Sequence, residues 1–211
     1  MGTDAATDLI RFTGADYAEF VPFGVVVADN PWPGKKTNGV RKHWLTDRTK
    51  LPYDTMSATD IMDLPVDRLA APNAVLFMWS TWMHLPLAVE CMGRWGFKYA
   101  SGFPWLKVTS SYSKVGSPIV PAFGLGVWAQ QCTELVLIGR RGVPFGKWGN
   151  PRPARKGIII AERQEHSRKP EQLQDWVDGT IHPVSFPSPR LELFARRQRT
   201  GWVCWGDQSG Q

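Results

Sequence analysis

Four consecutive residues, Asp29, Asn30, Pro31 and Trp32, form the most compact set of groups in the sequence that could do chemistry. The proline fixes its own φ angle and pushes the residue before it towards an extended backbone, which can aim the carbonyl of Asn30 outward. The Asp29 carboxylate and this carbonyl would then offer two adjacent hydrogen-bond acceptors beside the flat ring of Trp32. Such a set suits a planar group that bears an NH2, for example the exocyclic amine of a base. From these four residues alone, an ordinary turn after a strand is an open alternative.

Five short apolar runs predict strands that are covered on both faces. Helical patterns lie between them: one follows a capping motif at Ser57, one covers residues 84–95 and stops at Gly96, and one starts at Pro170. Strands that alternate with helices favour a doubly wound α/β sheet. The predicted strands lie at residues 23–28, 74–79, 134–139, 157–161 and 191–195.

The carboxyl ends of these strands are the expected place of a ligand site, because doubly wound sheets bind ligands there. Three segments follow predicted strands directly, at residues 29–32, 80–82 and 196–199. We therefore expect the three segments to meet at one edge of the sheet.

Composition limits the class of protein. The 211 residues are 43% hydrophobic and 21% charged, which excludes a wholly disordered chain, a coiled coil and a collagen-like fibre. The apolar runs are shorter than the ~20 residues of a membrane helix, and the first residues lack a secretory signal, so a cytoplasmic location without membrane contact is expected. The three cysteines form no CxxC pair and the histidines have no metal-ligand spacing, so neither a metal site nor a disulfide framework is predicted.

The positive charge is concentrated in one window. The net charge is +6, but residues 140–169 contain nine Lys and Arg against two Glu. Within it, residues 140–156 are rich in Gly and Pro and predict a basic loop. Phosphate neutralisation by this loop would make nucleic-acid binding depend on salt, and a solvated loop is the alternative. Its basic residues are Arg140, Arg141, Lys147, Arg152, Arg155 and Lys156.

A series of motifs in a fixed order resembles the MTA-seventy-like family of adenine-N6 methyltransferases. The family includes the catalytic subunit of the eukaryotic messenger-RNA adenine methyltransferase and many bacterial and phage DNA-modifying relatives. Its Asp-Pro-Pro-Trp motif appears here at residues 29–32, with Asn30 in place of a proline. The resemblance covers residues 23–208, and the further motifs lie at residues 53–57, 76–79, 95–99, 105–107, 124–142, 167–171, 191–196 and 201–206.

The resemblance implies a Rossmann-like α/β methyltransferase fold with helices on both faces, and a permuted order with the catalytic motif first and the cofactor strand last. It implies a methyltransferase domain at 23–208 between an N-terminal extension at 1–22 and a tail at 209–211. S-adenosylmethionine would be the methyl donor. By position, Tyr53 and Glu134 would lie near the cofactor and the target adenosine. The cofactor would be lined by Asp29, Lys169, Arg196, Gln198, Arg199, Asp207 and Gln208.

The function expected from these observations is methyl transfer to the N6 amine of adenine in DNA. Asp29 and the Asn30 carbonyl would hold the amine, and Trp32 would stack on a flipped or single-stranded base. DNA is favoured by the short chain and the resemblance. An RNA substrate, the N4 amine of cytosine and a catalytically silent relative that binds nucleic acid or a partner subunit are the alternatives. The oligomeric state is not predicted.

Overall fold

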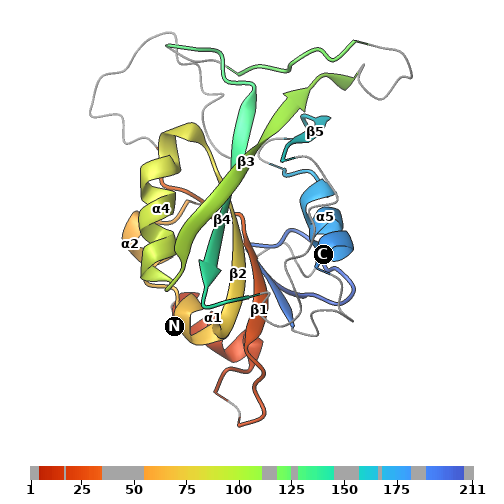
Figure 1. The fold of residues 1–211 in the computed structure, drawn as a ribbon. Coiled ribbons are helices and arrows are strands. Elements are labelled where there is room, and N and C mark those ends of the chain that lie inside the picture. Colours follow the sequence, from red (N-terminus) through yellow and green to blue (C-terminus); the bar gives the residue numbers. More distant parts are fainter. Residues whose placement is uncertain are drawn as a thin grey trace.

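A computed structural model describes residues 5–16, 18–34, 55–110, 118–124, 128–144, 157–165, 168–181 and 189–206. Its centre is a seven-stranded sheet in the order β5-β3-β4-β2-β1-β6-β7 (Figure 1). The strands are β1 (Phe23–Ala28), β2 (Ala70–Ser80), β3 (Lys98–Val108), β4 (Thr133–Arg141), β5 (Ile159–Glu162), β6 (Arg190–Leu193) and β7 (Val203–Trp205). The helices are α1 (Ala5–Thr13), α2 (Ala58–Met62), α3 (Val66–Leu69), the 3-10 turn η2 (Trp82–His84), α4 (Leu85–Arg94) and α5 (Gln172–Thr180).

Strand β1 lies where the strand order reverses. It pairs in parallel with β2 on one side and with β6 on the other, and all six of its residues are buried. The carboxyl ends of β1 and β6 therefore flank the topological switch point, where α/β sheets bind ligands. Along the chain, β1, which leads into the Asp29 segment, is the first strand, and β6 and β7 are the last strands. The predicted α/β fold with this permuted order is therefore confirmed.

Helices cover both faces of the sheet, as the continuous apolar runs predict. On one face Ala88, Cys91 and Met92 of α4 belong to one buried cluster, and on the other face Leu173 and Val177 of α5 belong to a second. Figure 1 shows α4 and α5 on opposite sides of the strands. None of the described helices is long and apolar enough to cross a membrane.

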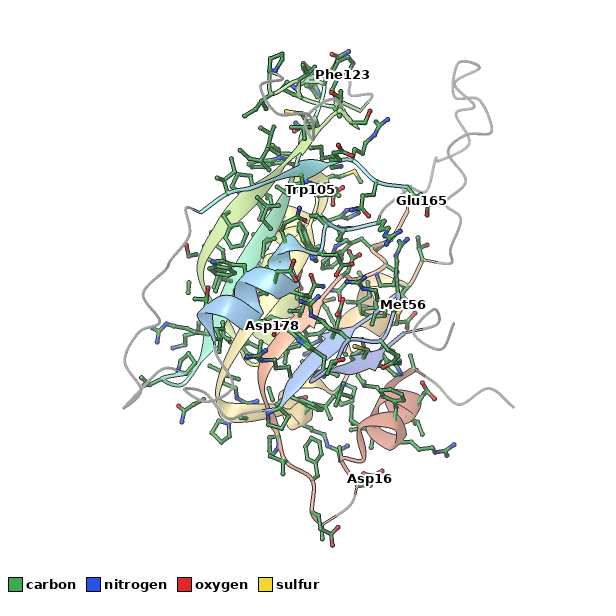
Figure 2. The ribbon with its side chains drawn as sticks, turned by 90° about the vertical axis from the view of Figure 1, so that its right-hand side faces the viewer. Asp16, Met56, Trp105, Phe123, Glu165 and Asp178 are labelled. Carbon is green, nitrogen blue, oxygen red and sulfur yellow. The ribbon has the colours of Figure 1, made fainter. Side chains whose placement is uncertain are left out.

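Strand β4 runs antiparallel to both of its neighbours, β2 and β3. Its first residues therefore lie at the edge where β1 and β2 end, and its last residues lie at the opposite edge. Between β3 and β4, residues 118–124 are described, and Phe123 among them lies far from the centre of the sheet (Figure 2).

The structure also contains elements that the apolar runs did not predict. The first half of β3 is exposed and β7 has only three residues, so neither shows a long apolar run. Helix α1 lies in the expected N-terminal extension, yet its Leu9 and Ile10 are buried in the main core. The helix predicted after Ser57 is two short helices, since Pro65 interrupts it; the Ser57 side chain caps the first as predicted.

Candidate active site

The three segments predicted to form a ligand site do meet at one edge of the sheet. Residues 29–32 follow β1, residues 80–82 contain the end of β2, and residues 196–199 follow β6, and these strands are parallel neighbours. Between them and α5 lies a cavity of about 240 Å³, whose lining includes Asp29, Trp79, Lys169, Gln174, Glu192 and Arg196. In Figure 2, α5 with Asp178 lies in front of the sheet, and Glu165, which also lines the cavity, belongs to the segment that leads to α5.

Lys169 joins two carboxylates in this cavity. Its Nζ lies 2.8 Å from Oδ1 of Asp29 and 3.4 Å from Oε2 of Glu134. The other oxygen of Glu134 accepts a hydrogen bond of 2.6 Å from Nζ of Lys107 on β3. Each of the four side chains is less than a quarter exposed, so the four charges form a partly buried chain in which acid and base alternate.

The two carboxylates of this chain respond differently to burial. Burial raises the pKa of Asp29 and the charge of Glu134 adds to the effect, while Lys169 opposes it without reversing it. Burial also disfavours ionisation of Glu134, but Lys169 and Lys107 outweigh it and lower the pKa of Glu134. Glu134 is therefore a firmly charged partner of both lysines, whereas Asp29 is the group whose ionisation is most open to change.

The backbone after Asp29 makes a tight turn. The Asn30 carbonyl accepts a 2.8 Å hydrogen bond from the N–H of Trp32, which uses one of its two lone pairs. The Asn30 side chain is buried, and neither of its polar atoms has a partner. One lone pair of the main-chain carbonyl thus remains, and the contact of this carbonyl with an amine stays a prediction. The buried carboxamide without partners costs stability.

Trp32 is packed into the turn. It is 9% exposed, its Nε1–H donates to the carbonyl of Trp79, and its ring stacks on His84 with centroids 5.8 Å apart. His84 in turn donates from Nε2 to the carbonyl of Pro33, and its Nδ1 lies 2.9 Å from Oγ1 of Thr81. Burial lowers the pKa of His84, which favours the neutral ring that these bonds need. The predicted contact of Trp32 with a base stays a prediction, and one face of its ring is already covered.

The loop after β6 is fastened to α5. Phe194 adopts a positive φ of 61°, which turns the chain out of the strand. Arg199 then lies 3.3 Å from Glu171, 2.6 Å from Asp175 and 3.0 Å from Asp178, so its guanidinium is surrounded by three carboxylates. Arg196 lines the cavity and contributes to the electrostatics of Asp29, whereas Gln198 is exposed. Arg199 also lines the cavity, so its predicted contact with the cofactor stays a prediction.

Comparison with known proteins decides the family. Residues 23–208 match the MT-A70 family model. The chain belongs to the MT-A70 family. It is 30% identical over 188 residues to the N(6)-adenosine-methyltransferase MT-A70-like protein of Arabidopsis thaliana, covering 88% of this chain and 24% of the relative. It is 28% identical over 201 residues to the N6-methyladenosine RNA methyltransferase MTA1 of Cryphonectria parasitica, covering 90% and 53%.

A bacterial MT-A70 relative is matched over more of its length. The chain is 28% identical over 200 residues to the type II methyltransferase M.MunI of Mycoplasma sp, covering 87% of this chain and 76% of the relative. By contrast, the chain spans only about a quarter of the length of the plant relatives.

Sequence reasoning missed three residues of this MT-A70 site: Glu192, Gln174 and Trp79. Burial raises the pKa of Glu192, which accepts a 2.9 Å hydrogen bond from Nε2 of Gln174. Oε1 of Gln174 and Nε1 of Trp79 are buried at the cavity without partners. A signal for Glu192 is present in the sequence, since this acid lies between two leucines of a predicted apolar strand. No comparable signal marks Gln174.

Some of the predicted residues do not join the site. Arg140 and Arg141 lie at the end of β4, at the edge opposite Asp29, and Arg141 donates to the carbonyls of Asp67 and Ala70. Their contact with nucleic acid stays a prediction, and such a contact would lie at the sheet edge opposite Asp29. The predicted residues Tyr53, Lys147, Arg152, Arg155, Lys156, Asp207 and Gln208 lie outside the described residues.

Proposed function

We propose that the chain transfers a methyl group from S-adenosylmethionine to the N6 amine of adenine in DNA. The observation that carries the proposal is Asp29, which Lys169 holds at 2.8 Å beside the cavity at the switch point. The membership of the MT-A70 family supports methyl transfer. DNA is supported by the bacterial relative, a type II methyltransferase of which the chain covers 76%.

The cavity fits the chemistry of S-adenosylmethionine, which carries a carboxylate, an ammonium group, a sulfonium and ribose hydroxyls. Lys169 and Arg196 line the cavity and suit the carboxylate, while Asp29 and Glu192 suit the positive and hydroxyl groups. The unpartnered Oε1 of Gln174 and Nε1 of Trp79 are a buried acceptor and a buried donor that a polar ligand would satisfy. When bound, the cofactor supplies an electrophilic methyl group.

Asp29 prepares the amine for attack. The lone pair of an adenine amine is delocalised into the ring, so the amine is a poor nucleophile. Hydrogen bonds from its N–H groups to the Asp29 carboxylate and the Asn30 carbonyl favour a pyramidal nitrogen with a localised lone pair. As the N–C bond forms, the bond between the methyl group and the sulfonium would break and leave a neutral thioether. The nitrogen gains the positive charge, which the carboxylate of Asp29 stabilises. The extra proton then leaves to Asp29 or to water.

Lys169 holds the carboxylate in place for this step. Its contact at Oδ1 fixes the carboxyl plane and leaves the amine to be bound through Oδ2, and its charge opposes the effect of burial on Asp29. Correct placement matters because in-line transfer needs the reacting atoms at near-attack distance. Lys169 is therefore assigned a double role, towards Asp29 and towards the carboxylate of the cofactor.

RNA is the second candidate substrate, and a specific observation favours it: the MTA1 relatives are named as RNA methyltransferases. DNA and RNA strands of the same sequence, incubated with the chain and S-adenosylmethionine carrying a labelled methyl group, separate the two. Mass spectrometry of the digested nucleosides should show labelled N6-methyldeoxyadenosine. Label on RNA alone would replace the DNA assignment, and label on neither would refute the proposed activity.

The Asp29→Ala variant tests the role of the carboxylate. We expect its methyl transfer to fall by at least about 100-fold, the cost of removing one preorganised electrostatic group. Asp16→Ala is the matched control, because Asp16 is an exposed carboxylate far from Glu165 in Figure 2. Substantial turnover by Asp29→Ala would overturn the assignment.

A further inference from the structure

Among the described residues, the exposed aromatic side chains include Trp82 just after β2, and Phe123 and Trp128 in the segment before β4. Trp82 follows the end of β2 and is 47% exposed, and its neighbour Met83 is exposed as well. Trp32, which the sequence predicts as the ring that stacks on a base, is buried and already stacked on His84. Of the two indoles that follow β1 and β2, the exposed one is therefore that of Trp82.

The position of Trp82 is held by a hydrogen bond. Its Nε1–H donates to Oγ1 of Thr133 at 2.8 Å, and Thr133 is the residue before Glu134 at the start of β4. The bond joins the η2 turn to the start of β4, so little rotamer freedom of Trp82 is left to lose when a ligand packs on the ring. An exposed indole whose N–H is satisfied within the protein presents mainly its flat faces.

Trp82 lies on the side of the edge from which the acceptor must approach. The cavity proposed for the cofactor lies on the α5 side, where Trp79 and Leu173 share a buried cluster. In-line transfer places the attacking nitrogen opposite the sulfur, so a base that approaches from the α4 side suits a cofactor held on the α5 side. Thr133 alternates with Glu134 and so faces the α4 side, and η2 leads directly into α4.

We infer that Trp82 is a stacking surface for a nucleobase of the substrate strand, with Met83 as its apolar neighbour. The inference rests on the proposed function and adds a residue that touches the substrate. Every base has a flat face, so stacking on an indole holds a strand next to Asp29 without selecting its sequence. A strand held there brings its adenine within reach of the Asp29 carboxylate.

Equilibrium binding tests the inference. The full chain is titrated into fluorescein-labelled single-stranded DNA, and separately into RNA of the same sequence, and anisotropy is recorded. We expect Trp82→Ala to weaken binding roughly 5- to 100-fold, the range for loss of one base–aromatic stack. Trp82→Phe keeps a ring and should stay within about threefold of the unaltered chain. S-adenosylmethionine affinity, measured by calorimetry, should be the same in both variants.

Tyr99→Ala is the matched control. Tyr99 is 53% exposed and lies at the start of β3, which is the opposite edge of the sheet because β3 runs parallel to β1. Nucleic-acid binding that is unchanged by Tyr99→Ala and reduced by Trp82→Ala supports the inference. Equal binding by Trp82→Ala and the unaltered chain overturns it while leaving the proposed function standing. An unaltered chain that binds neither DNA nor RNA overturns both.

Discussion

The charge chain around Lys169 gives the sharpest test of the site, because its two carboxylates influence each other through one ammonium group. Oδ1 of Asp29 and Oε2 of Glu134 both contact Nζ of Lys169, so they lie no more than about 6 Å apart. At an effective dielectric constant of ~20, two unit charges at that distance interact by about 3 kcal/mol. Glu134→Gln removes this repulsion, and Lys169→Met removes the attraction that opposes it.

The two substitutions should move the pH dependence of methyl transfer in opposite directions. Asp29 must be ionised to accept the amine N–H, so activity is lost as pH falls through its raised pKa. Glu134→Gln lowers the pKa of Asp29, and the acid limb of the rate profile should move down by about one to two pH units. Lys169→Met raises the pKa of Asp29, and the acid limb should move up.

The assay is the initial rate of labelled methyl transfer between pH 4.5 and 9, at saturating S-adenosylmethionine. Saturation matters because Lys169→Met is also expected to weaken cofactor binding. Lys98→Met is the control, since Lys98 lies at the start of β3, away from the site edge. Acid limbs that shift in the same direction, or that do not shift, would refute the electrostatic coupling of Asp29 and Glu134.

Three further outcomes follow from the contacts at the site. Burial raises the pKa of Asp29, so protonated Asp29 stabilises the folded state, and this contribution is lost as pH rises through the raised pKa. Asp29→Asn should therefore raise the unfolding temperature at pH 8, by about 2–4 °C for each kcal/mol of stability gained. The gain should disappear towards pH 4. His84→Phe keeps an aromatic ring but loses two hydrogen bonds, so the free energy of unfolding in urea should fall by about 1–3 kcal/mol. The kcat should fall and the cofactor affinity should stay unchanged. An unaltered kcat would show that His84 does not position the turn. Arg199→Met should weaken S-adenosylmethionine binding in calorimetry, because Arg199 both lines the cavity and anchors the loop, at a stability cost of about 1–2 kcal/mol since its partners are partly exposed. Arg199→Lys should not restore the binding.

The sequence predicts the centre of this fold well, because buried strands need continuous apolar runs. Strands β1, β2 and β6 lie close to their predicted positions, and their ends form the predicted site edge. Strand β3 is different, since its first half is exposed and contains Gly102, so it shows no such run. An apolar run also carries no direction, and the reversal of β4 was therefore not predictable from residues 134–139.

Some side chains of the site could likewise be predicted from the sequence, and others could not. Asp29 and Lys169 each belong to a short motif that can be recognised in the sequence. Their contact at 2.8 Å was not predicted. The burial of Trp32 depends on His84, which is distant in sequence and reaches the turn only through the pairing of β1 with β2. The role of Arg199 depends on acids of α5. Contacts of this kind follow from packing, which no local pattern records.

Because β4 is antiparallel to its neighbours, the segment before it and the segment after it lie at opposite edges of the sheet. Residues 128–132 lead into the strand at the edge that carries Asp29, whereas residues 142–144 leave from the opposite edge. An insertion before β4 lengthens a segment beside the substrate, but an equal insertion after β4 lengthens a connection on the far side of the sheet. Variation in length among related chains should therefore alter the choice of substrate when it falls before β4 and leave it unaltered when it falls directly after.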